Sequence, residues 1–152
     1  MKKQDKHLSI YTQTLTLLLT FIILSTTACG GEDDPTAQQL AFEKLSGNWD
    51  LTQGGSIIID GQDATANFTG FAFSFTDGGY STTNAGDMFR ASGTWQWTDE
   101  EAQQLSVDDG KTITIVTLTE TSFVFTFTSD GNAGTANHGE GIAGNYTISV
   151  NQ

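Results

Sequence analysis

The chain has 152 residues, with 18 acidic and six basic side chains, and its formal net charge is −12 at pH 7. This balance argues against nucleic acid as a partner, because phosphate binding requires clustered Lys and Arg. The single cysteine, Cys29, excludes a disulfide within the chain. A folded domain must therefore be stabilised by packing alone.

The N-terminal segment has the pattern of a secretory signal. Three lysines within the first six residues precede the apolar run 15–24, and small residues at 25–28 lead directly to Cys29. A transmembrane helix is the alternative, but it needs about twenty apolar residues. The apolar run is half that length and contains two threonines. The pattern predicts a signal peptide over residues 1–28.

A cysteine directly after such a site resembles the lipobox of bacterial lipoproteins. The resemblance implies that Cys29 is acylated, with palmitate as a typical chain, and becomes the first residue of the mature protein. Ala28 fits the motif, whereas Thr26 stands where the family usually has leucine, so ordinary secretion is the alternative. Loss of Lys2, Lys3, Lys6 and Asp5 with the signal would leave 17 acidic and three basic residues, a net charge of −14. Acyl chains would then hold the protein on the membrane, where charge could not.

Residues 29–36 form an acidic, flexible tether in this interpretation, with the run GGEDD at 30–34. Acidic residues just after a lipidated cysteine resemble the export tag of surface-displayed lipoproteins in Gram-negative bacteria. This resemblance implies an outer-membrane lipid anchor and exposure on the cell surface. A periplasmic or secreted protein is the alternative.

Residues 37–152 form the predicted folded domain, which begins with one short helix. Asp34 and Pro35 suit its N-cap and first position, and Gly47 would lie just past its end. Its apolar face would carry Leu40, Phe42 and Leu45.

From Gly47 onward the apolar residues alternate with polar ones, which is typical of antiparallel strands with one buried face. Asp-Gly pairs, which suit tight hairpins, begin at positions 60, 77, 109 and 130. The predicted strands are about 47–53, 56–59, 68–76, 79–84, 90–98, 104–107, 112–118, 122–128 and 144–150. Sequential hairpins favour an all-β fold, an up-and-down antiparallel barrel of about eight strands. A two-sheet β-sandwich is the alternative.

Several short motifs resemble the lipocalin-like domains of bacterial surface lipoproteins. They are LSGNW at 45–49, FAFSFTDGGYSTT at 71–83, SGTW at 92–95 and the turn at 108–110. The resemblance implies that Trp49 packs across the closed end of a barrel. In lipocalins an arginine of the last strand often packs against this tryptophan, but residues 145–150 contain none.

Motifs with catalytic or metal-binding potential do not have the required context. The glycine spacing at 139–144 matches a dinucleotide-binding loop, but a strand follows it where a helix is required. His138 is the one histidine after residue 28 and fits a solvated loop. With a single cysteine it cannot form a zinc site. We therefore expect no catalytic residues, no metal and no cofactor.

The aromatic residues on the strands must mostly fill the core, since an eight-stranded barrel is only just wide enough for its own side chains. Some could instead line a pocket for a small apolar or amphipathic ligand at the open end. The candidates are Trp95, Trp97, Phe73, Phe75 and Phe125. The first functional hypothesis is therefore a ligand-binding module. The second is a structural or accessory component of a cell-surface assembly, with a filled barrel; the oligomeric state is left open.

Overall fold

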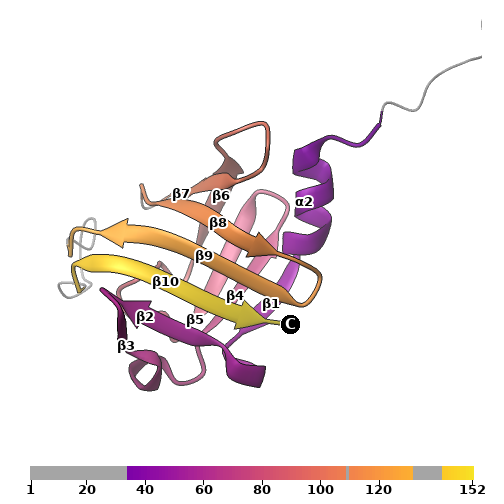
Figure 1. Cartoon of the computed structure of the whole chain (residues 1–152). Helices are drawn as coiled ribbons and strands as arrows, with labels where there is room; N and C mark the ends of the chain where they lie inside the picture. The colour runs from indigo at the N-terminus through magenta and orange to yellow at the C-terminus, as the bar shows by residue number, and fades with distance from the viewer. Residues whose placement is uncertain (1–33, 109, 132–141) are drawn as a thin grey trace, which may run out of the picture. The chain divides into compact units, whose positions relative to one another are not determined.

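In the computed structural model the described residues are 34–108, 110–131 and 142–152 (Figure 1). One helix precedes a run of short strands in this part of the chain. The elements are α2 (Ala37–Leu45), β1 (Gly47–Asp50), η1 (Thr52–Gly54), β2 (Ser56–Ile59), β3 (Gln62–Asp63), η2 (Thr65–Phe68), β4 (Ala72–Thr76), β5 (Gly79–Thr83), β6 (Ser92–Trp97), β7 (Gln104–Val107), β8 (Thr112–Leu118), β9 (Ser122–Ser129) and β10 (Gly144–Asn151).

Eight antiparallel strands, β1 and β4 to β10, form a closed barrel. Each strand from β4 to β9 pairs with the next one in sequence, and β1 pairs with β4 on one side and with β10 on the other. The closing pair joins Asp50 to Asn151. The predicted all-β up-and-down barrel is confirmed, and its closed ring of pairing distinguishes it from the alternative two-sheet sandwich.

The first predicted strand, 47–53, ends early because the chain turns at η1. The side chain of Asp50 accepts hydrogen bonds from the Thr52 N–H, at 2.7 Å, and from the Thr52 hydroxyl. The chain then resumes as β2, which pairs with β10. The Asp60-Gly61 turn has positive φ at both residues, 48° and 79°, as a tight hairpin requires. It leads into β3, which the sequence did not predict.

The helix begins at Ala37, so the prediction of Asp34 as N-cap and Pro35 as first helical residue is wrong. Thr36 is the N-cap, because its hydroxyl accepts the Gln39 N–H at 3.2 Å while the Gln39 side chain accepts the Thr36 N–H at 2.8 Å. This reciprocal capping box occupies two N–H groups that would otherwise lack partners. Gly47 starts β1 just beyond the helix, as expected.

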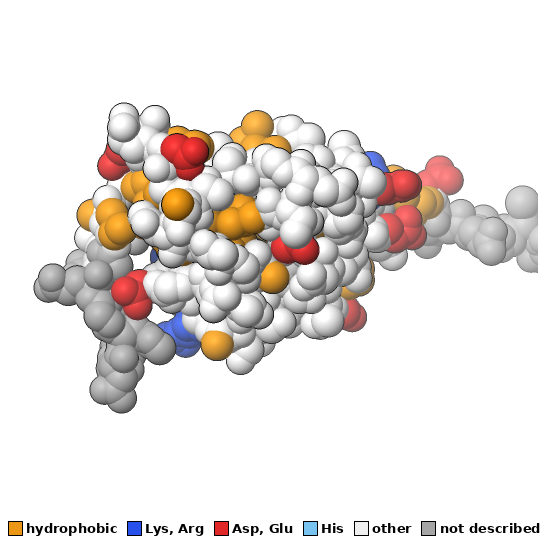
Figure 2. All heavy atoms as spheres, turned by 90° about the horizontal axis from the view of Figure 1, so that it is seen from below, with side chains coloured by type: hydrophobic (Ala, Val, Ile, Leu, Met, Phe, Trp, Pro, Cys, Tyr) orange, Lys and Arg blue, Asp and Glu red, His pale blue; other side chains and the backbone are white. Residues whose placement is uncertain are grey.

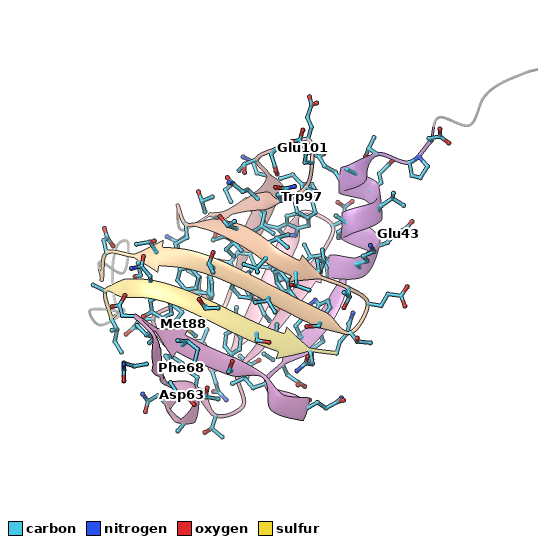
Figure 3. The ribbon with its side chains drawn as sticks, viewed as in Figure 1. Glu43, Asp63, Phe68, Met88, Trp97 and Glu101 are labelled. Atoms are coloured by element: carbon cyan, nitrogen blue, oxygen red, sulfur yellow. The ribbon has the colours of Figure 1, made fainter. Side chains whose placement is uncertain are left out.

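The inward-facing side chains fill the barrel with aromatic rings (Figure 3). The largest fully buried ones are Trp49, Phe71, Phe73, Phe75, Phe123 and Phe125. The loop between β5 and β6 adds Met88 and Phe89, which are 3% and 4% exposed. The ring of Phe89 lies 4.9 Å from those of Phe73 and Phe127. The interior is therefore packed by rings from strands and from this loop.

The surface is mainly polar, and no buried polar or charged residue occurs among the described positions. On the face shown in Figure 2, hydrophobic side chains form small separate groups among uncharged polar ones. Leu40, Val116 and Ile142 are large hydrophobic residues that remain exposed. No helix in the described part of the chain is both long and apolar enough to cross a membrane.

Candidate functional site

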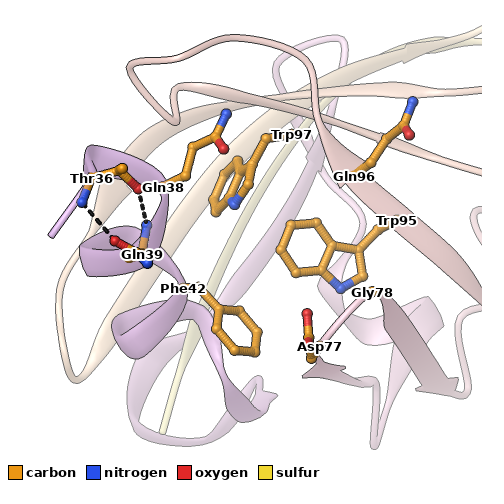
Figure 4. A pocket seen from close by; sticks show the side chains of 9 residues that line it. All are labelled: Thr36, Gln38, Gln39, Phe42, Asp77, Gly78, Trp95, Gln96 and Trp97. Carbon is orange, nitrogen blue, oxygen red and sulfur yellow. Dashed lines mark hydrogen bonds between the residues drawn. The ribbon is translucent and has the colours of Figure 1, made fainter. Parts of the chain in front are cut away.

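A cleft of about 580 Å³ lies between α2, the turn that joins β4 to β5, and strand β6. We call it the helix-side cleft (Figure 4). Its lining combines three aromatic rings with neutral amides and one carboxylate. The lining residues are Thr36, Gln38, Gln39, Phe42, Asp77, Gly78, Trp95, Gln96 and Trp97.

Strand β6 places the two tryptophans of the cleft. Because successive side chains on a strand alternate between its faces, Trp95 and Trp97 lie on the same face and Gln96 on the other. Their ring centroids are 5.1 Å apart and their planes meet at 88°. The Trp95 indole N–H donates to the carbonyl oxygen of Thr76 at 2.9 Å, which ties β6 to the β4–β5 turn. Trp95 is 7% exposed, and Trp97 is half-buried.

Helix α2 supplies the third ring and the opposite wall. The ring of Phe42 lies 5.9 Å from that of Trp95, with 32° between the planes. The side-chain amide of Gln38 donates to the carbonyl oxygen of Asp99 at 2.7 Å. Asp99 belongs to the β6–β7 loop, so this bond fixes the helix to the end of the barrel. The cleft thus has walls held by hydrogen bonds and ring contacts.

Some polar groups of the cleft already form hydrogen bonds within the protein, and others do not. Thr36 and Gln39 are engaged with each other in the capping box. Asp77 is exposed on the β4–β5 turn, and Figure 4 shows its side chain directed toward the Trp95 indole. The indole N–H of Trp97 donates no hydrogen bond to any described residue. Among the described residues, the site therefore offers apolar ring faces, one carboxylate and the indole donor of Trp97.

The structure divides the predicted ligand-binding residues into two groups. Trp95 and Trp97 line the helix-side cleft. Phe73, Phe75 and Phe125 lie in the core, at most 1% exposed. The ring of Phe73 is 4.3 Å from that of Phe75 and 6.0 Å from that of Phe125. None of these three phenylalanines lines the helix-side cleft.

Trp49 is fully buried where α2 meets the barrel. Its indole N–H donates to the carbonyl oxygen of Leu45, the last helical residue, at 2.8 Å. Its ring lies 5.6 Å from that of Phe123. A backbone carbonyl and a phenylalanine ring thus contact Trp49 in the described part of the chain.

Sequence reasoning did not predict the contributions of Phe42, Gln38 and Asp77 to the cleft. Phe42 was expected on the apolar face of the helix, and that pattern was the available signal. Its contact with Trp95 depends on how the helix lies against the barrel, which no local pattern specifies. Asp77 was interpreted as a hairpin residue, and it is also the carboxylate of the cleft.

A second polar cluster lies at the junction of β5, β6 and β7. The Tyr80 hydroxyl donates to the Asp108 carboxylate at 2.9 Å, and Arg90 lies 3.9 Å from the same carboxylate. Gly93 faces this cluster, and any Cβ atom there would overlap the Asp108 side chain. These contacts join β5, β6 and the end of β7, so we interpret the cluster as structural.

The remaining predicted positions fall outside the described residues: Cys29, His138 and the glycine-rich motif up to residue 141. Among the described residues, no group of three or more His, Cys, Asp or Glu side chains could hold a metal ion.

Comparison with known proteins gives no match: no protein-family model, no curated protein and no solved structure is significantly similar to this chain.

Proposed function

We propose that this protein is a non-catalytic binding module that takes a small apolar or amphipathic ligand in the helix-side cleft. The observation that carries the proposal is the open aromatic cleft of Phe42, Trp95 and Trp97 at one end of a closed barrel. Apolar surfaces with a few placed polar groups are typical of small-ligand sites.

The packed interior supports the cleft, in preference to the barrel centre, as the binding place. Phe73 lies within 6.4 Å, centroid to centroid, of five other aromatic rings. A ligand at this level of the barrel would have to displace rings that are fully buried. The helix-side cleft requires no such displacement.

The binding test is a titration of the purified full chain with an uncharged, environment-sensitive fluorescent dye. We expect saturable binding that Trp97→Ala weakens by at least about fivefold, since most of the apolar contact would be lost. Phe73→Leu is the matched control, because it changes a core ring and should leave dye affinity within about twofold. Equal affinity in the Trp97 variant would contradict the proposed site.

We further propose that Cys29 carries acyl chains and anchors the domain outside the cytoplasm, on the outer membrane and facing the cell exterior. Support comes from the signal pattern, Ala28 and the acidic run 30–34. Mass spectrometry of the mature N-terminus tests processing and acylation, and protease shaving of intact cells tests display. An unmodified Cys29 would favour the secreted alternative.

A second candidate function is a structural or accessory role in a cell-surface assembly. The observation in its favour is the same packed interior, because a filled barrel is rigid and needs no ligand. Cross-linking on intact cells distinguishes the two. A stable partner adduct, together with no saturable dye binding, would favour the accessory role.

A further inference from the structure

The three rings of the helix-side cleft surround its hollow on three sides. Trp95 contacts Phe42 on one side and Trp97 on the other, at centroid distances of 5.9 Å and 5.1 Å. Figure 4 shows Trp97 and Phe42 on either side of the space between Trp95 and helix α2. The faces of aromatic rings carry partial negative charge and attract cations, and this attraction is strongest for tryptophan.

The charges of the cleft have the same sign as the ring faces. Asp77 is the sole charged residue in the lining, which contains neither Lys nor Arg. The adjoining β6–β7 loop adds Glu100 and Glu101, both exposed. The whole chain carries a net charge of −12. A cleft lined by one sign of charge concentrates counter-ions near its mouth, so cations are favoured here.

Most hydrogen-bond donors in the same place are already engaged, which disfavours an anionic head group. The first turn of α2 borders the cleft, but the N–H groups of Thr36 and Gln39 are already bound within the capping box. Gln38 is committed to the Asp99 carbonyl oxygen. The Trp95 indole N–H is committed to Thr76. An anion would therefore lie near the Asp77 carboxylate, with the Trp97 indole N–H as the main donor left to offset the repulsion.

We propose that the helix-side cleft binds an amphipathic organic cation, namely an ammonium or quaternary ammonium group carried on an apolar body. The cationic head lies against the half-buried Trp97 ring and the small exposed part of the Trp95 ring, near Asp77, and the apolar body extends along Phe42. This inference rests on the proposed binding function and specifies the chemical class of its ligand.

The test compares choline with dimethylbutanol, its neutral isostere, in which a carbon atom replaces the nitrogen. Both are titrated into the full chain in a polyoxyethylene detergent, and the three indole N–H signals are followed by NMR. The signals of Trp95 and Trp97 should move, while that of Trp49, buried and bonded to Leu45, should not. We expect choline to bind at least about tenfold more tightly than the isostere, as cation–π attraction at several rings implies.

Two variants separate the contributions of ring and charge. Trp97→Leu keeps an apolar side chain but removes the ring, and should weaken choline at least about fivefold with little effect on the isostere. Asp77→Asn should weaken choline about threefold and reduce the salt dependence of its binding. Asn-Gly also suits the hairpin turn. Asp87→Asn, which removes an exposed charge from the β5–β6 loop, is the matched control and should change nothing.

The possible outcomes are distinct. Equal affinity for the two probes, no shift with either, or unchanged choline binding in Trp97→Leu would overturn the cation assignment. The proposed function would still stand if the uncharged dye bound and Trp97→Ala weakened it. Absence of dye binding with clear choline binding would support the cation and restrict the ligand to charged molecules.

Discussion

At the residue scale, Gly93 holds a place that no other residue type can fill without a rearrangement. A Cβ atom there would lie 2.6 Å from Cγ of Asp108, so the carboxylate would move and its hydrogen bond with Tyr80 would break. We expect Gly93→Ala to lower the free energy of unfolding by about 1 kcal/mol. Denaturant titration of the purified variant measures this.

A double-mutant cycle identifies the cause of that loss. In an Asp108→Ala background no carboxylate is displaced, and alanine is better than glycine in a strand. Gly93→Ala should then be neutral or slightly stabilising. Additive losses in the double variant would show that the strain lies elsewhere.

Burial of Tyr146 makes the stability of the fold depend on pH at the alkaline end. Its side chain is 3% exposed, and its hydroxyl donates to the Ile142 carbonyl oxygen at 2.7 Å. Burial raises the pKa of Tyr146 above its ordinary value, and the negative charges of Asp60 and Asp87 raise it further. The folded protein therefore holds this proton more tightly than the unfolded chain does.

The stabilisation linked to Tyr146 is complete below about pH 10, where the unfolded phenol is still protonated. It is lost as the pH rises through the raised pKa of the folded state. We expect Tyr146→Phe to remove the part of the stability loss at alkaline pH that comes from ionisation of this phenol. Denaturant titrations at pH values on either side of 10 would measure the difference in the free energy of unfolding. An unchanged pH profile would assign the loss to other tyrosines or lysines.

Asp63 contributes to the pH dependence of stability on the acid side through its contact with Thr65. Hydrogen bonds from the Thr65 hydroxyl and then its backbone N–H lower the pKa of Asp63. The stabilisation linked to this lowered pKa is fully present when the pH is above the ordinary pKa of a carboxyl group. It is lost as the pH falls through the lower pKa of Asp63 in the folded state. The Asp63 carboxylate is fully exposed, so its hydrogen bonds stabilise only the local turn at the start of η2.

At the scale of elements, α2 depends on its cap. We expect Thr36→Ala to cost about 1 kcal/mol of helix stability, since the Gln39 N–H loses its acceptor. The readout is hydrogen exchange, which should accelerate in the first turn of α2 more than in the barrel strands. Thr36→Ser keeps the hydroxyl and should behave like the unmodified chain. Equal acceleration in both variants would mean that the cap does not stabilise the helix.

The strand ranges were predictable because period-two alternation is a local signal. The predicted strands 68–76 and 122–128 correspond to β4 (Ala72–Thr76) and β9 (Ser122–Ser129), both with buried phenylalanines. The first was predicted too long, because Phe68 belongs to η2. β3 was missed because its two residues are both exposed and show no alternation. The helix start was misplaced because two adjacent cap patterns compete, and the reciprocal bonds of Thr36 and Gln39 favour the later one.

The candidate site was predictable only in part, for a physical reason. Alternation places Trp95 and Trp97 on one face, but it cannot distinguish a core position from a rim position. Phe73, Phe75 and Phe125 have the same pattern, and they are buried because they lie deeper in the barrel. Phe42 of the helix is 53 residues away from Trp95 in the sequence. Their contact depends on tertiary structure, and a local sequence pattern cannot predict it.

At the scale of the whole molecule, the aromatic interior is the main source of stability. We expect Phe73→Ala to cost about 3–5 kcal/mol, because the cavity left by the ring would be surrounded by rigid neighbours. Denaturant titration measures this, with Phe68→Ala as the comparison. Phe68 lies in η2 and is 9% exposed, so its loss should be smaller. Equal costs would mean that the interior relaxes around the missing ring.

The pairing of β10 has a consequence for the order in which the chain can fold. β10 contacts β9 over its whole length, β2 beside it and β1 at Asp50. Among the described strands it is also the last to be synthesised, so the ring cannot close until residues 144–151 have left the ribosome. A chain still being synthesised can form hairpins, but it cannot form the closed barrel.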